Sequence, residues 1–296
     1  MISIIIPTRD RPTGLQRTLD GLAAMTVPLG VAWEIIVVDN GRPDLTREVV
    51  ARHAAASGLR VHYLHEDHPG VSRARNRGMQ VARGEILAFT DDDMVVDSGW
   101  LAHIHREFSA DPTLGLLTGR VIMRLPDGSE RPVRGGTDRQ TFGYPANPRR
   151  AGSGGNMALR ASVAARVGSF DERLGLGISA WGGEDVDYIY RALKAGYTVL
   201  YSPQFLAYHE RDTTRPNRLP NGMGAVLAKH ALRGDRWMVG LLVAMSWRFL
   251  GTAFGPGARD RVLALRKFAA LYGGAARWLR LEAGEWVRSL WTRRPK

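Results

Sequence analysis

The order of apolar and polar residues predicts alternating strands and helices over the first part of the chain. Short apolar runs bounded by turn residues are typical of buried strands. They occur near residues 2–6, 33–38, 60–64 and 85–90. Stretches with helical periodicity follow them, near residues 13–25, 44–57, 71–82 and 98–109. This alternation predicts a mostly parallel sheet with helices on both faces.

The pattern becomes less regular after the fourth strand. Residues 116–123 predict another strand, and residues 124–155 are rich in proline, glycine and charge, which is typical of a long connection. Gly154-Gly155-Asn156 then leads an apolar run back into the sheet, and residues 204–208 again resemble a strand. The α/β region is therefore expected to extend to about residue 214.

Three adjacent aspartates, Asp91-Asp92-Asp93, directly follow the strand predicted at residues 85–90. Carboxylates crowded at a strand end repel one another and lose solvation, and a bound cation usually compensates for this. Oxygen ligands favour Mg²⁺ or Mn²⁺, often shared with phosphates of a substrate. In an extended segment Asp91 and Asp93 would project to the same side and reach one metal ion. The alternative is a solvated acidic turn that caps the helix near Trp100.

A second pair of acids, Glu184-Asp185, opens a helix that is predicted to end at Gly196. Acidic residues at a helix N-terminus complement the helix dipole, which is sufficient to explain their type. It does not explain the preceding Trp181-Gly182-Gly183. A carboxylate in a glycine-lined cleft is well placed to act as a general base.

Together these segments resemble glycosyltransferase family 2, whose nucleotide-sugar-binding fold is called GT-A. The matching segments are residues 3–10, 34–40, 70–78, 91–93, 154–156 and 183–185. Each is weak alone, and their order and spacing make the resemblance specific. Residues 181–185 also resemble a motif of metal-dependent galactosyl- and N-acetylgalactosaminyltransferases. One departure is Asp97-Ser98-Gly99, where family members often have a proline, and it implies a changed turn.

The resemblance implies a role for each matched residue. Those implied to bind the nucleotide sugar are Pro7, Thr8, Arg9, Asp39, Arg75, Asp91, Asp92 and Asn156. Those implied to hold a metal ion are Asp91, Asp93 and His209. Asp185 is implied to be the catalytic base, and the acceptor is implied to contact Glu184, Trp181 and Gly183. Simpler alternatives remain, because Asp39 could cap a turn, Arg75 could lie on a helix surface and His209 could be structural.

The implied reaction is an inverting transfer with Mn²⁺ or Mg²⁺ as cofactor. The donor would be a nucleotide-diphosphate sugar, by default a UDP-sugar, and the acceptor a hydroxyl of a glycan, glycolipid or lipid-linked acceptor. Two alternatives remain open: a nucleotidyltransferase that makes activated sugars, and a catalytically inactive membrane or scaffold protein on a transferase fold. The Gly-rich basic loop expected near the N-terminus of the first is missing. The acids whose loss would indicate the second are present.

The chain contains no cysteine, which excludes disulfides, thiolate metal sites and cysteine nucleophiles. This composition suits a reducing cytoplasm. The apolar run at residues 2–6 is too short for a signal peptide and is followed at once by Pro7. We therefore expect a cytoplasmic protein.

The net charge of +12 is confined to one end of the chain. Residues 215–296 hold sixteen Lys and Arg against four acidic residues, whereas residues 1–214 hold twenty-five of each. Five of the eight tryptophans also lie after residue 214. We therefore expect a GT-A catalytic domain over residues 1–214, with a nucleotide-sugar-binding half at 1–110 and an acceptor-binding half at 111–214. Residues 215–296 are expected to form a basic helical extension.

The longest apolar stretch of this extension, residues 237–247, is shorter than the roughly 20 residues that span a bilayer. Tryptophan, leucine and basic residues on helices fit contact with an anionic membrane surface. We expect a peripheral protein at the inner face of the plasma membrane, and the alternative is that these helices pack on the catalytic domain. No nucleic-acid recognition motif accompanies the charge, so nucleic acid is not an expected partner. No pattern in the sequence indicates an oligomeric state.

Overall fold

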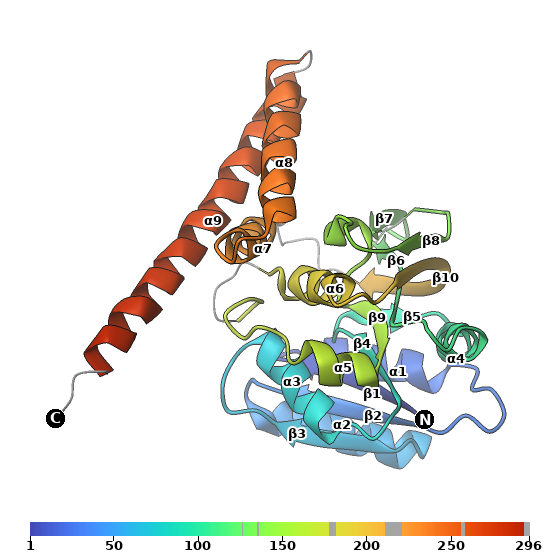
Figure 1. Ribbon diagram of the computed structural model, residues 1–296. Helices are drawn as coiled ribbons and strands as arrows, with labels where there is room; N and C mark the ends of the chain where they lie inside the picture. Colours follow the sequence, from blue (N-terminus) through green and yellow to red (C-terminus); the bar gives the residue numbers. More distant parts are fainter. Residues whose placement is uncertain (126, 135, 178–181, 211–220, 256–257, 293–296) are drawn as a thin grey trace. The chain divides into compact units, whose positions relative to one another are not determined.

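The computed structural model describes residues 1–125, 127–134, 136–177, 182–210, 221–255 and 258–292 (Figure 1). The chain divides into two compact units. The first unit comprises residues 1–178 and 184–215, and contains the sheet. The second unit comprises residues 179–183 and 216–296, and contains the last three helices that the structure describes.

The first half of the sheet is parallel and has the expected alternation of strands and helices. Its strands are β1 (Ile2–Thr8), β2 (Trp33–Asp39), β3 (Val61–His65) and β4 (Ile86–Thr90), and they lie in the order β3-β2-β1-β4. Its helices are α1 (Pro12–Ala23), α2 (Pro43–Ser57), α3 (Val71–Val81) and α4 (Trp100–Ala110). All these elements lie within a few residues of the bounds predicted from the sequence.

The second half of the sheet is mixed. Its strands are β5 (Met94–Val96), β6 (Leu116–Arg124), β7 (Glu130–Arg134), β8 (Gln140–Phe142), β9 (Asn156–Arg160) and β10 (Val199–Glu210). The sheet continues from β4 in the order β9-β6-β10-β5, while β7 pairs with β6 and β8 with β10. Strand β9 runs antiparallel to both of its neighbours, and β6 and β10 are parallel. The expected α/β sheet flanked by helices is present, with more antiparallel pairing than the sequence predicted.

The connection expected at residues 124–155 contains β7, β8 and a short 3-10 helix at Pro148–Arg150. These strands have exposed side chains, so they lack the apolar run that reveals a buried strand. Two further helices, α5 (Ala161–Val167) and α6 (Glu184–Lys194), complete the first unit.

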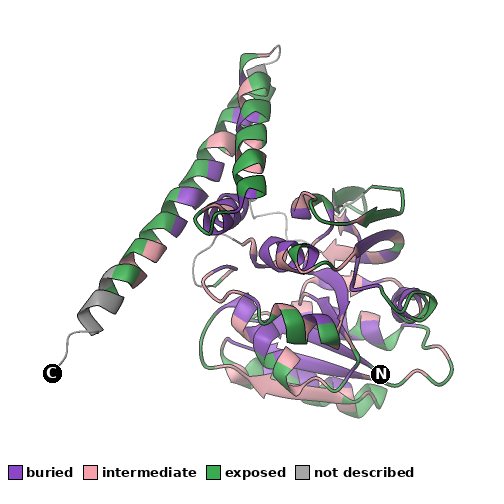
Figure 2. Cartoon of the chain, viewed as in Figure 1, coloured by how far each residue is buried: buried purple, intermediate pink, exposed green. Residues whose placement is uncertain are grey.

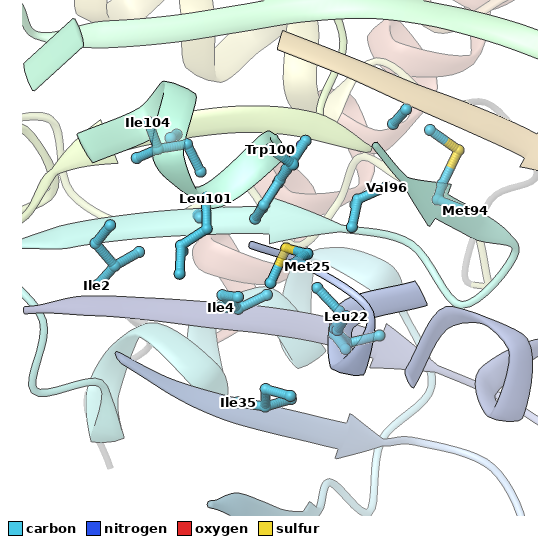
Figure 3. Close-up of a cluster of buried hydrophobic side chains, with 14 of the residues drawn as sticks. Ile2, Ile4, Leu22, Met25, Ile35, Met94, Val96, Trp100, Leu101 and Ile104 are labelled. Carbon is cyan, nitrogen blue, oxygen red and sulfur yellow. The ribbon is translucent and has the colours of Figure 1, made fainter. Parts of the chain in front are cut away.

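The core explains why the central strands are continuously apolar. Successive side chains of β1 alternate between the two faces, with Ile4 and Ile6 in one buried cluster and Ile5 in the other. Helices α1, α2 and α4 cover the first face, where Trp100 is fully buried (Figure 3). Helices α3, α5 and α6 cover the second face. Each fully buried isoleucine contributes about 1.5–3 kcal/mol relative to an exposed one.

The second unit consists of α7 (Asn221–Ala231), α8 (Arg236–Phe254) and α9 (Ala258–Thr292). Helices α7 and α9 approach closely at two glycines. A Cβ atom on Gly224 would overlap the carbonyl oxygen of Leu271, and one on Gly274 would overlap that of Asn221. Helix α8 is linked to α9 by a hydrogen bond of 2.9 Å between the hydroxyls of Ser246 and Tyr272.

Helix α8 is longer than the apolar stretch recognised in the sequence. It continues through Arg248 to Phe254, and an 18-residue window of this 19-residue helix has a mean hydropathy of 1.3. Among the described residues it is the one helix that could cross a membrane by length and composition alone, which also holds for many core helices of soluble proteins. Helix α8 extends beyond residues 237–247, so the shortness of that stretch does not exclude a spanning helix.

Candidate active site

The three aspartates lie at the carboxyl end of β4, the edge at which open α/β sheets bind ligands. They form a turn before β5, because the amide of Met94 donates a hydrogen bond of 3.2 Å to the carbonyl oxygen of Asp91. The extended conformation that the sequence analysis assumed is therefore wrong. As a result, each of the three carboxylates has its own partners.

Asp93 lies between an arginine and a histidine. Its Oδ2 accepts a hydrogen bond of 2.5 Å from Nη1 of Arg11, and its Oδ1 lies 3.5 Å from Nε2 of His209. The position of His209 follows from the pairing of β10 with β5, which aligns it with Met94. The structure thus brings together Asp93 and His209, two of the three proposed metal ligands. The sequence analysis missed Arg11, whose only signal was its position just after the first strand.

Asp92 is buried and turns toward the end of β1. Its Oδ2 accepts a hydrogen bond of 2.8 Å from the hydroxyl of Thr8, and its Oδ1 accepts one of 3.2 Å from Arg11. Burial, together with the neighbouring Asp93 carboxylate, raises the pKa of Asp92 to about 6. Two residues assigned to the nucleotide sugar, Thr8 and Asp92, therefore bind each other here and hold the acidic turn against β1.

Asp91 points the other way, toward a buried arginine that connects two parts of the site. Nη2 of Arg75 donates a hydrogen bond of 2.8 Å to Asp91, and Nη1 donates one of 2.9 Å to Glu184. Arg75 is 2% exposed, and the nearby carboxylates raise its pKa against the effect of burial. Burial and the charge of Asp185 raise the pKa of Glu184, and the ion pair with Arg75 opposes this. Arg75 thus joins the acidic turn to the start of α6.

Asp185, the proposed base, is held by backbone amides. Its Oδ2 accepts a hydrogen bond of 2.9 Å from the amide of Gly154, and its Oδ1 accepts one of 2.8 Å from that of Val186. The two glycines before β9 are required by this packing. A Cβ atom on Gly154 would lie 2.9 Å from the Cβ of Asp185, and one on Gly155 would lie 2.5 Å from Oδ2 of Asp91. The segments at 91–93, 154–155 and 184–185 therefore converge.

The residues proposed to bind the base lie at the ends of β1 and β2. Asp39 is fully buried and accepts hydrogen bonds from the amide of Gly41, at 2.9 Å, and from the hydroxyl of Tyr63, at 3.2 Å. Burial, with Asp39 as the second cause, raises the pKa of Tyr63 to about 12. Pro7 is a buried residue of β1, whereas the side chain of Arg9 is 48% exposed.

The family to which these segments belong can be established directly. The model of Glycosyl transferase family 2 matches residues 3–168, more than half of the chain. The chain belongs to glycosyltransferase family 2. The recognition made from the sequence is thereby confirmed, and the protein is a glycosyltransferase of the nucleotide-sugar-dependent type.

Among the relatives of this family 2 glycosyltransferase is the succinoglycan biosynthesis protein ExoM of Rhizobium meliloti. It is 31% identical over 289 residues, which cover 92% of this chain and 91% of ExoM. The pre-mycofactocin glycosyltransferase of Mycobacterium tuberculosis is 28% identical over 86% of this chain and 54% of its own length.

Two solved structures confirm the expected GT-A fold. Residues 1–349 of S. aureus TarS, in complex with UDP-GlcNAc, have a TM-score of 0.66 at 17% identity, covering 91% of this chain and 81% of that one. The mannosyltransferase PcManGT of Pyrobaculum calidifontis, in complex with GDP-Man and Mn²⁺, has a TM-score of 0.61 at 18% identity. It covers 94% of this chain and 86% of its own.

Asn156, assigned to the donor from the family resemblance, has an internal role in this structure. It is fully buried, and its amide nitrogen donates hydrogen bonds of 3.0 and 2.8 Å to the carbonyl oxygens of Arg120 and Phe205. Its side-chain oxygen accepts one of 2.8 Å from the indole of Trp100. The side chain joins β9 to β6, β10 and α4, and its role in donor binding stays a prediction.

Of the proposed acceptor-binding residues other than Glu184, Gly183 belongs to the second unit. Trp181 is outside the described residues. Gly183 has a φ of 96°, and a Cβ atom there would lie 2.7 Å from the carbonyl oxygen of Gly222. Glycine is thus required at residue 183 by its conformation and by the approach of α7, whatever its role toward an acceptor.

The donor set of the family 2 site fits a divalent metal ion in part. Over the described part of the chain, no three His, Asp or Glu side chains converge as a complete metal site requires. Asp93 and His209 are adjacent, and the ring nitrogen Nδ1 of His209 is buried without a hydrogen-bond partner. A carboxylate and an imidazole are ligands of Mn²⁺, and the diphosphate of a donor commonly supplies further oxygens.

Proposed function

We propose that this family 2 enzyme is an inverting, metal-assisted glycosyltransferase. It moves a sugar from a nucleotide-diphosphate sugar, by default a UDP-sugar, to a hydroxyl of a glycan, glycolipid or lipid-linked acceptor. The proposal is carried by one observation: the acidic turn, the glycine pair and the start of α6 converge around buried Arg75. UDP-GlcNAc bound to TarS and GDP-Man with Mn²⁺ bound to PcManGT support the donor class and the metal.

The acceptor side of the reaction is assigned to the start of α6. Asp185 removes the proton from the acceptor hydroxyl as that oxygen attacks the anomeric carbon. The two backbone amides that donate to Asp185 fix its orientation. Glu184, held by Arg75, is assigned to the acceptor hydroxyls, together with residues 181 and 183. A single displacement inverts the anomeric configuration, so the enzyme needs no nucleophilic residue.

The donor side is assigned to the carboxyl ends of β1, β2 and β4. Asp93 and His209 hold the metal. Asp91 joins them after its carboxylate exchanges Arg75 for the metal. When bound, Mn²⁺ or Mg²⁺ neutralises charge on the leaving diphosphate. Asp39 is assigned to the base, and the remaining donor contacts to residues 7–9, Arg75 and Asp92.

A donor screen tests this proposal. UDP-, GDP- and dTDP-sugars are incubated with the protein and Mg²⁺ or Mn²⁺, and release of the nucleoside diphosphate is measured. We expect release from one donor class, loss of release in EDTA, and a product of inverted anomeric configuration by NMR. Asp185→Asn should lower turnover by about 10²-fold or more while donor affinity persists. The matched variant Asp67→Asn, at a side chain that is 88% exposed, should behave as the wild type.

The same screen separates the alternatives. Pyrophosphate release from a nucleoside triphosphate and a sugar 1-phosphate would identify a nucleotidyltransferase and overturn the proposal. Absence of turnover with every donor and acceptor would favour an inactive transferase fold. If Asp185→Asn lost donor affinity but turned over bound donor normally, Asp185 would be a binding residue.

We also propose that the enzyme is cytoplasmic and lies peripherally at the inner face of the plasma membrane. Residues 215–296 support this through their net charge of +12 and their five tryptophans. No nucleic acid is proposed as a partner.

A further inference from the structure

Helix α8 of the second unit carries a row of exposed apolar side chains. Val239, Val243, Trp247 and Phe254 are 45%, 49%, 72% and 83% exposed. Their spacing of four, four and seven residues places them on one face of the helix. Residues on the opposite face, including Phe249, are buried. Figure 2 shows how much of α8 is exposed.

Helix α9 adds a second exposed apolar row. Leu265, Tyr272, Leu279 and Trp286 are each more than 40% exposed and recur every seven residues. Such a period places all four side chains along one side of a long helix. Helices α8 and α9 are joined by the hydrogen bond between Ser246 and Tyr272, so this helix pair exposes apolar side chains on both of its members. Monomeric soluble proteins rarely leave surfaces of this kind uncovered.

The basic residues near these rows favour an anionic bilayer over a second copy of the chain as the surface that covers them. Residues 215–296 carry a net charge of +12, and α9 alone contains Arg266, Lys267 and Arg280 among its basic residues. A second copy of the chain would bring a like charge to the same place, which opposes pairing. An anionic bilayer offers both an apolar layer for the exposed rows and negative headgroups for the basic residues.

We infer that the exposed rows of α8 and α9, named here the hairpin face, lie in the headgroup region of an anionic lipid bilayer. This inference rests on the peripheral location proposed above. It identifies the hairpin face as the surface that contacts the membrane. Trp247 and Phe254 insert deepest, because they are the most exposed large apolar residues of α8. Tryptophan is favoured at this depth, where its ring is apolar and its N–H meets water.

The positions of basic residues on α8 and α9 argue against an orientation in which α8 spans the membrane. Arg248 lies within the helix, directly after Trp247, and is exposed. The partner helix α9 carries basic residues at 261, 266 and 267 in its first turns. A helix pair that crossed the bilayer would bring these charges into hydrocarbon, which is costly, whereas a pair lying in the surface keeps them at the headgroups.

Vesicle co-sedimentation with the full-length protein tests the hairpin face. Vesicles of phosphatidylcholine alone, and of equal parts phosphatidylcholine and phosphatidylglycerol, are compared at low and high salt. We expect binding to the anionic vesicles that weakens with salt, since the basic part of the attraction is screened. The double variant Trp247→Glu, Phe254→Glu should bind at least about tenfold more weakly, because it places charge on the inserted face. The matched control is Leu29→Glu, Leu45→Glu, at two exposed leucines of the first unit, which should bind as the wild type.

The charge contribution has its own pair of variants. Arg266→Gln, Arg280→Gln should reduce the preference for anionic vesicles and the salt dependence by about twofold or more. Arg60→Gln, Arg166→Gln removes two exposed charges from the first unit and should leave both unchanged. In the intact protein, brominated phosphatidylcholine should quench tryptophan fluorescence, which gives a readout that needs no variant.

Each other result overturns the inference. An intact protein that ignores anionic vesicles, or a Trp247→Glu, Phe254→Glu variant that binds them normally, would reject the hairpin face. Conversion of a dimer to a monomer by this variant, with vesicle binding unchanged, would make the face a subunit interface. An aggregated variant, together with an intact protein that shows no lipid quenching, would indicate packing on the catalytic unit. Donor hydrolysis is measured for every variant, so failure of the proposed function is seen separately from failure of lipid binding.

Discussion

The two units of this glycosyltransferase differ in how their charged side chains are balanced and paired. Residues 1–214 hold equal numbers of basic and acidic side chains, and the site pairs buried Arg75 with the buried Glu184 and the partly exposed Asp91. The second unit is strongly basic, and its close contact between α7 and α9 is made by glycine backbones. Buried charge that is paired can hold a reactive geometry, whereas exposed charge beside apolar side chains suits an interface. We therefore expect variants of the first unit to affect turnover and stability, and variants of the exposed rows of the second unit to affect vesicle binding.

The largest expected effect is that of the metal on the first unit. EDTA, or Asp93→Ala, should lower turnover by at least about 100-fold, because metal stabilisation of the leaving group contributes several kcal/mol. Vesicle binding by the second unit should not change. Release of nucleoside diphosphate is measured with and without added Mn²⁺. Full turnover in EDTA would remove the metal from the mechanism.

The buried ion pairs of Arg75 should dominate the stability of the first unit. Arg75→Met leaves the buried carboxylate of Glu184 uncompensated and should lower the free energy of unfolding by about 3–5 kcal/mol. Adding Glu184→Gln should recover part of this loss. The control Arg52→Met breaks an exposed pair with Glu48, at 2.6 Å, and should cost no more than about 0.5 kcal/mol. Equal losses in urea unfolding for the two arginines would show that burial of the pair is unimportant.

A buried histidine should make the first unit sensitive to acid. His103 accepts or donates a hydrogen bond of 2.9 Å with Ser202, and burial, then the charge of Arg106, lowers its pKa to about 4. The unfolded chain therefore binds more protons between about pH 6.5 and 4, so stability is lost as the pH falls through this window. We expect a loss of about 3 kcal/mol between pH 7 and 4 that is absent in His103→Gln. Urea unfolding at several pH values measures the difference, and parallel curves for the two proteins would contradict it.

Two neighbouring glycines of α9, Gly273 and Gly274, should respond differently to substitution by alanine, because only Gly274 contacts another helix. Gly274→Ala places a methyl group on the carbonyl of Asn221 and should destabilise α7–α9 by about 1–3 kcal/mol. Gly273→Ala, beside it on α9, meets nothing within 4 Å and should stabilise by about 0.5–1 kcal/mol. Thermal unfolding followed by far-ultraviolet circular dichroism compares the two, and donor hydrolysis should be unchanged. Equal effects would show that the helices do not pack closely at Gly274.

Much of the fold could be predicted from the sequence because the strands that build it are buried on both faces. β1, β2 and β4 are continuous apolar runs, and short turns separate them from periodic helices. β7 and β8 could not be found in this way, because exposed edge strands need no apolar pattern. The antiparallel direction of β9 is set by its neighbours and has no local signal.

The sequence predicted which types of residue form the candidate site, but not which side chains pair with one another there. The acids at 91–93 and 184–185 were recognisable from their place after a strand and before a helix. The pairing of Arg75 with Glu184 joins residues 109 positions apart, and that of Thr8 with Asp92 joins residues 84 apart. Such pairs depend on how the strands and helices assemble. This is why the sequence did not reveal Arg11 as a partner of Asp93, or the hydrogen bond from the Asn156 amide to the carbonyl oxygen of Phe205.

A crossed assay of two variants tests most directly whether transfer chemistry and lipid contact belong to separate units. Donor hydrolysis and binding to anionic vesicles are both measured for Asp185→Asn and for Trp247→Glu. We predict that Asp185→Asn loses turnover and keeps vesicle binding, and that Trp247→Glu keeps donor hydrolysis and loses vesicle binding. Loss of both properties in either folded variant, or loss of neither, would contradict this division.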